Sequence, residues 1–330
     1  MMTNQNQSPT LSRTFLEFER PIAELMAKID ELRHLSSSSE INIYPEILRL
    51  EEEARKLTDR IFCNLTPWQK TLLSRHPDRP IASDYLQIVF QNFKELHGDR
   101  IFADDKAIIA GLAQIDDIDV LVICQEKGRG TKEKVFRNFG MPRPEGYRKA
   151  LRLMQLAEKF DLPIITLIDT PGAYPGKGAE ERGQAEAIAR NLKEMIKLTV
   201  PVISIVIGEG GSGGALAIGI GNRVLMMQYA IYSVISPEGC ASILWKDASK
   251  AHLAAEAMRL TAEEILELNV IDEIIPEPIG GAHRNLEETS TLLSNYIVKH
   301  LKELKKMSPA MLVQQRFDKF LSMGVVLENG

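Results

Sequence analysis

This sequence has few cysteines and no long hydrophobic run, and its glycine and proline stay at ordinary levels; each of these facts excludes a class of protein. No stretch reaches the roughly 18 uninterrupted apolar residues that a membrane span needs, so we do not expect a membrane protein. With 22 glycines and 16 prolines in 330 residues, the composition also excludes collagen-like and low-complexity material. What is left is the composition of an ordinary globular protein.

The three cysteines, Cys63, Cys124 and Cys240, lie far apart in the sequence. Their spacing excludes a CxxC zinc or redox motif, and their odd number argues against a disulfide scaffold. We therefore expect three buried structural thiols in a reducing compartment. Residues 1–14 carry one arginine and no apolar core, which is typical of neither a secretory signal nor a transit peptide. We expect a cytoplasmic protein, or one in the stroma of a plastid that encodes it.

Basic residues are fewer than acidic residues, so the net charge is −5. A protein with this net charge is not expected to bind along nucleic acid. One segment departs from this balance. Residues 127–152 hold nine basic and two acidic side chains, a local charge of +7. Such a segment suggests a polyanionic ligand, an acidic partner, a subunit contact or a solvated loop. Few aromatic residues interleave with these charges, so RNA is the least favoured of the ligands.

Residues 1–82 predict a helical assembly region. Apolar residues recur at helical spacing between Phe15 and Leu32, and Ser36–Ser39 interrupts the pattern. A second helix is expected from Pro45 to Cys63, acidic at its start and basic later, which suits the helix dipole. No chemistry is evident in this region.

Strands and helices alternate over residues 83–284. The near-continuous apolar strands at Pro163–Asp169 and Pro201–Ile207 are typical of parallel strands with both faces covered. The alternation predicts an α/β fold with right-handed crossovers, followed by a C-terminal helical segment over residues 285–330. The other expected elements are strands at 106–114, 120–125, 224–227, 232–235 and 270–275 and helices at 147–160, 179–198 and 215–220.

Two glycine-containing turns, Asp169–Gly176 and Gly208–Ala215, directly follow those two apolar strands. Open α/β sheets place ligands at the carboxyl ends of their parallel strands. Gly172 and Gly213 are 41 residues apart, which is one turn–helix–strand–turn unit. We therefore expect the two turns to be neighbours in space.

A glycine run before a helix suits an anion. The first helical N–H groups lack partners within the helix, the helix dipole adds positive potential, and glycine lets a ligand oxygen approach the backbone. The anion is either a phosphate or an oxyanion of a transition state. Phosphate is the weaker choice, because the run holds no GxxxxGK[ST] and its GxGxxG lacks a clear ribose-binding acid. A purely structural turn is the alternative.

Other chemistry finds less support. Ser212 matches a Gly-x-Ser-x-Gly pattern, but no acid or histidine partner is marked, so a helix N-cap or turn role is favoured over a nucleophile. Glu180 and Glu181 fall in the first turn of a helix, where satisfying the dipole is favoured over acid–base work. We predict no metal site, because no histidine is spaced with another or with a cysteine as a metal pair. The histidines are His34, His76, His97, His252, His283 and His300.

Longer runs of the sequence resemble a known family. Arg137–Pro142, Pro144–Ala150 and Tyr232–Trp245, together with the two turns, are similar to the carboxyltransferase α subunit of multisubunit acetyl-CoA carboxylase, the bacterial and plastid type. Phe15–Leu25 and Glu277–Arg284 match as well, so the resemblance extends over most of the chain. These long runs are far more specific than any short motif.

The resemblance implies a crotonase-like α/β fold, a spiral of ββα units, with an N-terminal helical arm and C-terminal helices. It implies an α₂β₂ carboxyltransferase whose active site is shared by an α and a β chain, with zinc on the β chain. The implied reaction transfers a carboxyl group from carboxybiotin to acetyl-CoA and gives malonyl-CoA, the first committed step of fatty acid synthesis. Biotin is carried by a separate biotin carboxyl carrier protein that works with biotin carboxylase. On this chain we therefore expect no covalent biotin, no metal, no membrane contact and no nucleic acid.

The resemblance also assigns an oxyanion hole for biotin to backbone N–H groups of the glycine run, here Gly213 and Gly214. Such a donor typically contributes ~3–4 kcal/mol to the transition state. No side-chain base is required, because the biotin enolate itself can take the proton of acetyl-CoA. Gly214→Val is predicted to abolish transfer, since a β-branched side chain would fill the oxyanion site. Gly172, Ala173, Tyr174, Gly210, Gly211 and Ala215 are expected to line the same pocket, and Arg148, Lys149 and Arg152 are expected to meet CoA phosphates or the β chain.

Two rival functions stay open. A self-sufficient crotonase-type hydratase or isomerase would need Glu180 or Glu181 to face an acyl-CoA and would be active without a partner. A non-catalytic RNA-binding or scaffold protein would use the +7 segment and show a steep salt dependence of binding. Against the first rival, we predict that this chain alone is inactive, because it supplies a glycine run for only one oxyanion hole.

Overall fold

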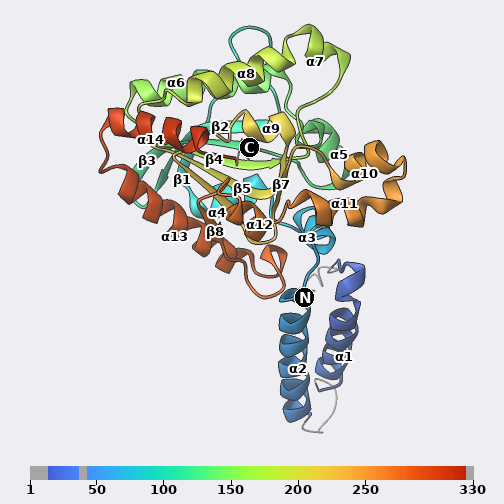
Figure 1. Ribbon diagram of the computed structural model, residues 1–330. Coiled ribbons are helices and arrows are strands. Elements are labelled where there is room, and N and C mark those ends of the chain that lie inside the picture. Colours follow the sequence, from blue (N-terminus) through green and yellow to red (C-terminus); the bar gives the residue numbers. More distant parts are fainter. Residues whose placement is uncertain (1–13, 37–42, 325–330) are drawn as a thin grey trace, which may run out of the picture. The chain divides into compact units, whose positions relative to one another are not determined.

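The computed structural model describes residues 14–36 and 43–324 (Figure 1). Most of the predicted break at Ser36–Ser39, and nearly all of the N-terminal segment, therefore lie outside the described residues. The chain forms two compact units. Unit 1 comprises residues up to 64 together with 76–78, and unit 2 comprises 65–75 and 79 onward.

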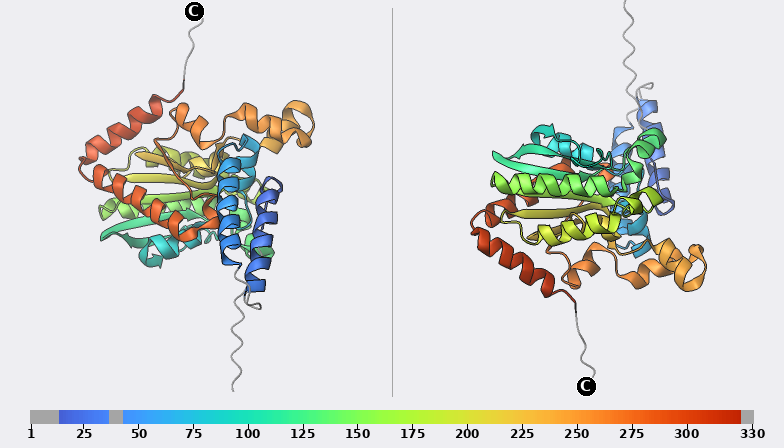
Figure 2. Two further views of the ribbon diagram at one scale, coloured as in Figure 1. Left: turned by 90° about the horizontal axis from the view of Figure 1, so that it is seen from below. Right: turned by 90° about the horizontal axis from the view of Figure 1, so that it is seen from above.

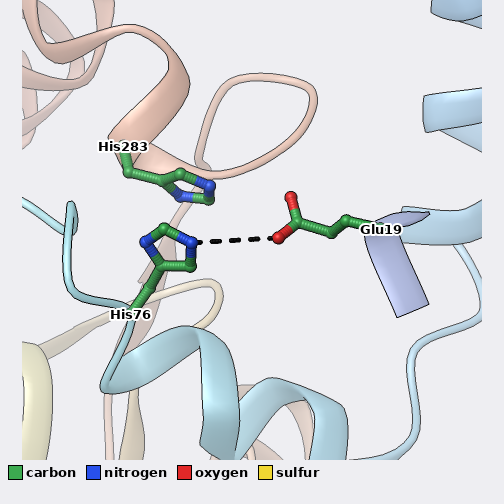
Figure 3. A group of neighbouring side chains, drawn as sticks. All are labelled: Glu19, His76 and His283. Carbon is green, nitrogen blue, oxygen red and sulfur yellow. Dashed lines mark ion pairs between the residues drawn. The ribbon is translucent and has the colours of Figure 1, made fainter. Parts of the chain in front are cut away.

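Unit 1 is a pair of helices that pack against each other. A 3₁₀ turn, η1 (Glu17–Glu19), leads into α1 (Arg20–Ser36), and α2 (Tyr44–Phe62) follows. The apolar stripe predicted from the sequence forms the contact, with Ile29 and Ile47 almost fully buried. In the same unit the buried carboxylate of Glu19 faces the imidazole of His76 at 3.8 Å (Figure 3). Because both side chains are buried, this pair is fixed by packing and not exposed to solvent.

The boundary between the units differs from the predicted limit at residue 82. Helices α3 (Pro67–Ser74) and α4 (Ala82–Val89) both belong to unit 2. Tyr85 and Val89 of α4 lie in the large apolar core of that unit. Periodicity in the sequence predicted helices at 15–32 and 45–63 but neither α3 nor α4, and it carries no information about which unit a helix packs on. Whether residues 1–82 serve assembly stays a prediction.

Unit 2 is built on one mixed sheet of eight strands, and the predicted strands from β2 to β8 are all present. Its strands are β1 (Gln91–Glu95), β2 (Ile108–Ile115), β3 (Ile118–Gln125), β4 (Ile164–Thr170), β5 (Val202–Gly211), β6 (Arg223–Met227), β7 (Ile231–Ser233) and β8 (Glu273–Ile275). Its longer helices besides α3 and α4 are α6 (Pro144–Lys159), α8 (Gln184–Met195), α10 (Pro237–Trp245), α11 (Ala251–Met258), α13 (Leu286–Leu304) and α14 (Pro309–Leu321). The short helices are α5 (Gly130–Phe136), α7 (Lys177–Glu181), α9 (Ser212–Leu216) and α12 (Ala262–Glu267), with 3₁₀ turns η2 (Asn138–Gly140), η3 (Ala248–Lys250) and η4 (Ala282–Arg284).

The strand order is β1-β2-β3-β4-β5-β6-β8. The first three strands pair antiparallel, and from β3 onward every pair is parallel. Strand β5 pairs with β6 through its first half and with β7 through Glu209–Gly211. Strand β5 therefore changes its pairing partner from β6 to β7 at the glycine run.

Helices cover both faces of this sheet (Figure 1), and the two views of Figure 2 show one face each. Helices α6 and α8 lie on one face, and α4 and α13 lie on the other. Every residue of β4 is buried, as expected for a parallel strand between two helical layers. Leu293 and Leu304 of α13 and Leu312 of α14 join the same core, so residues 285–324 pack as part of unit 2.

The single helix predicted over Ala179–Leu198 is wrong. The structure contains two helices, α7 and α8, separated at Gly183, whose φ is +81°. A left-handed residue cannot continue a right-handed helix, and glycine adopts that conformation without a Cβ penalty. The expectation of three buried thiols is also wrong, since Cys124 is buried, Cys240 is half-buried and Cys63 is exposed.

Candidate active site at the carboxyl ends of strands β4 and β5

The two glycine-containing turns are neighbours, as the sequence predicts. Strands β4 and β5 run parallel, with Thr170 paired to Gly210 at their ends. Glycine lets the two backbones touch. A Cβ on Gly214 would lie 2.5 Å from the carbonyl carbon of Gly172 and 2.7 Å from the nitrogen of Ala173, and a Cβ on Gly211 would overlap the carbonyl of Pro171. Real Cβ atoms do not approach so closely, so neither position accepts a side chain without separating the turns.

Helix α9 begins at Ser212, three residues earlier than predicted, and β5 extends through Gly211. Ser212 itself has a φ of +52°, so the chain turns sharply from strand to helix. Gly213 and Gly214 occupy the second and third helical positions, where N–H groups have no carbonyl within the helix to bind. Within the part of the chain that the structure describes, neither N–H donates to another group. These two donors, at the positive end of the helix dipole, form a place for negative charge.

The neighbouring turn is held by its own hydrogen bonds. The N–H of Gly172 donates to Thr170 Oγ1 at 3.1 Å, and that hydroxyl donates to the carbonyl of Gly172 at 2.8 Å. The N–H of Tyr174 donates to the carbonyl of Pro142, and the guanidinium of Arg143 lies over the Tyr174 ring. Gly172 and Tyr174 therefore shape the wall of the site, but their N–H groups are already engaged within the chain.

The remaining predicted pocket residues lie under the same turn. Gly210 is buried in β5, and a Cβ there would lie 2.7 Å from the ring of Tyr232 on β7. Ala215 is fully buried in α9, and Ala173 is half-buried beside Ile188 of α8. Ile188 also faces Gly213, with 3.6 Å between its methyl and a Cβ built there. The surroundings of the two donors are thus apolar on the α8 side.

Behind the turns lies a network of charged side chains that the sequence did not reveal. The ammonium of Lys127, just past the end of β3, binds Asp169 and Glu209, each at 2.6 Å. Arg75 of the α3 C-cap binds Glu209 from the other side and also reaches Glu238 of α10. Asp169 and Glu209 lie at the start of the two turns, so the ammonium of Lys127 links the two turns at that point.

Burial and charge set the pKa values of this network. Burial raises the pKa of the Glu209 carboxyl, but Lys127 and Arg75 outweigh it, so this pKa lies below its usual value. For Asp169 burial dominates, and its pKa lies above the usual value despite Lys127. Burial lowers the pKa of Lys127, but the two carboxylates outweigh it and raise that pKa. The ammonium therefore stays charged between its two partners.

Most of the basic segment is neutralised within the chain. Besides Lys127, Arg129 binds Asp84 at 2.7 Å and Arg148 binds Asp99 at 2.8 Å. Lys149 is fully buried, and its ammonium donates to Asp104 and to the carbonyls of Asp105 and Ile108. All three donors of Lys149 are used, so the predicted contact of Lys149 with CoA or another chain is wrong.

Arg148 and Arg152 lie on the outer side of α6. Both line a cavity of about 560 Å³ that also contains Arg190 and Glu194 of α8. The guanidinium of Arg152 donates to two backbone carbonyls, those of Gly98 and His97, and no carboxylate pair is recorded for it among the described residues. Of Arg148, Lys149 and Arg152, only Arg152 carries a charge that no carboxylate among the described residues pairs with.

The structure gives little support to the rival catalytic groups. Within residues 14–36 and 43–324, the Ser212 hydroxyl makes no hydrogen bond to a histidine or a carboxylate. Glu180 and Glu181 are exposed on the short helix α7, and Glu181 lies 3.5 Å from Lys177. They are therefore surface residues of that helix.

Comparison with known proteins decides the family. The family described as acetyl co-enzyme A carboxylase carboxyltransferase-like matches residues 15–324. The acetyl-coenzyme A carboxylase carboxyl transferase subunit alpha of Methylococcus capsulatus is 62% identical over 95% of this chain and 98% of its own length. The subunit of the same name from Halorhodospira halophila is 59% identical over 95% of this chain and 99% of its own length.

The chain belongs to the acetyl-CoA carboxylase carboxyltransferase α family.

Solved structures show the same fold at low identity. A transcarboxylase 12S structure aligns with a TM-score of 0.55 and 16% identity, over 75% of this chain and 43% of that chain. The beta subunit of Pseudomonas aeruginosa geranyl-CoA carboxylase aligns with a TM-score of 0.52 and 16% identity, over 71% and 44%. The predicted crotonase-like α/β fold is confirmed.

In this carboxyltransferase α family member, the sequence alone indicates the local features of the site. The glycine run and the Asp169–Gly176 turn are each continuous in sequence, so both can be recognised from sequence. The network of Lys127 and Arg75 joins residues up to 163 positions apart and has no local signal in the sequence. No helix in the described parts of this carboxyltransferase family member combines the length and apolar character of a membrane span.

Proposed function

We propose that this chain is the α subunit of a carboxyltransferase that moves the carboxyl group of carboxybiotin to acetyl-CoA, which yields malonyl-CoA and biotin. The family and the names of its relatives support the reaction. The single observation that carries the site is the pair of N–H groups of Gly213 and Gly214, which point from the start of α9 without an acceptor among the residues that the structure describes.

The two N–H groups are suited to the charge that the reaction creates. Release of the carboxyl group from the ureido nitrogen leaves negative charge on the ureido oxygen. Backbone donors at a helix start stabilise such a charge without any proton transfer, and one donor typically contributes ~3–4 kcal/mol. Gly213 and Gly214 would hold that oxygen, with Ala173 and Ile188 against the ring. No carboxylate or imidazole of this chain has to act as a base.

The biotin group is carried to the site on a separate protein. The residues present fit such a visiting group, because the donors lie beside an exposed turn, with Gly213 and Ser212 half-buried and Leu216 40% exposed. When bound, carboxybiotin supplies the activated carboxyl group. We place the reaction in the cytoplasm, or in the stroma of a plastid, together with biotin carboxylase and the biotin carboxyl carrier protein.

A second chain is needed to complete the site. The relatives are named as subunit alpha, and this chain offers one glycine run with free donors, whereas charge also develops on the thioester oxygen of acetyl-CoA. We assign the second oxyanion hole and the zinc to a β subunit in an α₂β₂ assembly. Val234, Ile243 and Leu244, which are 77%, 70% and 63% exposed, follow the strand that pairs with the glycine run. They form the apolar surface that we assign to this partner.

Arg148 and Arg152 are our candidates for the CoA phosphates or a β-chain contact. Arg152 has no recorded carboxylate partner among the described residues, and Arg148 shares its charge with Asp99. Lys149 is left out, because its ammonium is enclosed.

The test is the reverse reaction, in which malonyl-CoA is decarboxylated with a free biotin derivative as the acceptor. The chain is assayed alone and together with a carboxyltransferase β subunit. We expect turnover only in the mixture, because each chain supplies one oxyanion hole. Ser212→Ala serves as the matched control within the run, since it removes a hydroxyl and keeps every N–H, and it should retain turnover.

Other results would favour other functions. Equal turnover by the single chain would indicate a self-contained crotonase-type enzyme and return Glu180 and Glu181 to the catalytic candidates. Loss of all turnover in the Ser212→Ala complex would favour a serine nucleophile. No turnover from a verified complex would contradict the proposal and favour a scaffold role.

A further inference from the structure

Gln125, the last residue of β3, is fully buried between the two turns of the site. Its side-chain nitrogen donates to the carbonyl oxygen of Gly214 at 2.7 Å. Its side-chain oxygen accepts from the N–H of Asp169 at 3.2 Å. One amide therefore joins the glycine run after β5 to the base of the turn after β4. The opposite orientation of the amide would lose both bonds, so the two partners fix it.

The carbonyl of Gly214 depends on this side chain because α9 is too short to satisfy it. The N–H of Ala217 donates to the carbonyl of Gly213, and the N–H of Ile218 donates to the carbonyl of Ala215. Neither of these N–H groups therefore pairs with the carbonyl of Gly214. A buried carbonyl without a donor is costly. Gln125 supplies that donor from the neighbouring strand.

We propose that Gln125 is a positioning residue that aims the N–H groups of Gly213 and Gly214 at the reacting oxygen. Its hydrogen bond holds the peptide after Gly214, and its bond to Asp169 sets that peptide relative to the 170–173 turn. A glycine pair has wide backbone freedom, so an external hold is what keeps two donors convergent. The inference rests on the proposed function, because it gives these N–H groups their purpose.

Thr166 on β4 provides a matched comparison. It is also fully buried, and its hydroxyl donates at 2.7 Å to the carbonyl of Ile218, just past α9. Thr166→Val removes one buried hydrogen bond of the same kind and keeps the shape of the side chain. The bond removed does not end on the glycine run, so it reports the general cost of a lost buried hydrogen bond in this sheet.

The experiment uses the complex with a β subunit and the reverse reaction with malonyl-CoA and a free biotin derivative. Gln125→Met removes both bonds at similar volume. Gln125→Glu keeps an oxygen for the N–H of Asp169, and because burial at this position favours the protonated carboxyl, its O–H keeps a donor for Gly214. For each variant kcat and KM are measured per assembled complex, together with the thermal midpoint.

We expect Gln125→Met to lose at least tenfold in kcat while KM for malonyl-CoA stays within twofold, and Gln125→Glu, which keeps both bonds when protonated, to lose less than threefold. Thr166→Val should keep kcat within twofold, because the carbonyl of Ile218 still accepts from the hydroxyl of Ser204 and the glycine run is untouched. The inference is overturned if Gln125→Met keeps its kcat, if Thr166→Val loses as much kcat as Gln125→Met, or if neither Gln125 variant assembles. In each of these cases the role of Gln125 is only structural.

Failure of the proposed function gives a different result. If the unaltered complex shows no turnover, the carboxyltransferase proposal itself fails. If the unaltered complex is active and the Gln125 variants match it, only the positioning role is lost.

Discussion

Gly213 and Gly214 are adjacent in sequence, but their surroundings differ. A Cβ on Gly213 would make ordinary contacts with Ile188 at 3.6 and 3.7 Å, whereas one on Gly214 would collide with the backbone of Gly172 and Ala173. A valine at 214 would thus act first by separating the two turns, not by filling the oxyanion site as predicted from the sequence. The two positions can be told apart by stability.

Gly213→Ala should fold at least as stably as the unaltered chain, because alanine is favoured over glycine inside a helix by about 0.5–1 kcal/mol. Gly214→Ala should lose about 1–3 kcal/mol, because its Cβ overpacks a backbone contact of 2.5 Å. Urea unfolding of both variants checks this. Equal free energies of unfolding would mean that the turns are not in contact in solution.

Lys127 holds two carboxylates with a side chain that is only 17% exposed. Lys127→Met should lower the free energy of unfolding by about 3–5 kcal/mol at pH 7, because Asp169 and Glu209 lose a shared buried partner. The exposed Lys56→Met, with 68% of its side chain exposed, should change it by less than about 0.5 kcal/mol.

The sign of the pH dependence tests the same residue. Without Lys127 the folded-state pKa values of Asp169 and Glu209 are higher than in the unaltered protein, so the folded state of the variant binds protons more tightly. The loss of unfolding free energy caused by Lys127→Met should therefore become smaller as the pH falls from 7 toward 5. Urea unfolding at both pH values measures it, and a constant deficit would contradict the assignment.

At the scale of elements, helix α14 completes the end of α8. The fully buried guanidinium of Arg316 donates to the carbonyls of Met195, Leu198 and Val200 and to Asn222 Oδ1. Burial without a bound carboxylate lowers the pKa of Arg316 to about 10, which leaves it charged at neutral pH. Carbonyls that a helix end leaves unpaired are thus satisfied from a helix 120 residues later in the chain.

Arg316→Met should lower the free energy of unfolding by about 3 kcal/mol, because the carbonyls of Leu198 and Val200, among other buried acceptors, lose a donor. Arg259→Met is the matched surface control, since Arg259 is 45% exposed and makes one ion pair with Glu267. That control should change stability by less than about 1 kcal/mol. Similar urea midpoints for the two variants would show that α14 is not held through Arg316.

At the scale of the whole molecule, charge is balanced by long-range pairs. Several cations of residues 127–152 meet acids from other parts of the chain, such as Asp84, Asp99 and Asp104. The surface that follows β7 carries the exposed apolar side chains of Val234, Ile243 and Leu244. That face therefore suits a protein partner.

A double substitution, Ile243→Glu with Leu244→Glu, should weaken association with a β subunit at least tenfold, because it places two charges on that apolar surface. The thermal midpoint of the free chain should not change, since both side chains are exposed. Phe160→Glu, at a position 62% exposed at the end of α6, is the control. Sedimentation or calorimetry measures the affinity of each variant for the β subunit. An unchanged affinity of the double variant would mean that the β subunit binds to another surface.

The sequence by itself determined the parallel strands, the two glycine-containing turns and their proximity. Each of these follows from local pattern, because continuous apolar runs make buried strands and parallel strands place their carboxyl ends together. The family resemblance likewise rests on continuous runs. Gly183 shows the limit of such patterns, since the sequence predicted one helix across it and a single left-handed residue divides that helix.

Only the tertiary structure decided the partners of the buried polar groups. Gln125 reaches a carbonyl 89 residues away, and Lys127 reaches a carboxylate 82 residues away. It also placed the ammonium of Lys149 in the interior, where the sequence suggested a surface cation. A buried donor must find an acceptor wherever the fold brings one, and that distance in space has no counterpart in local periodicity.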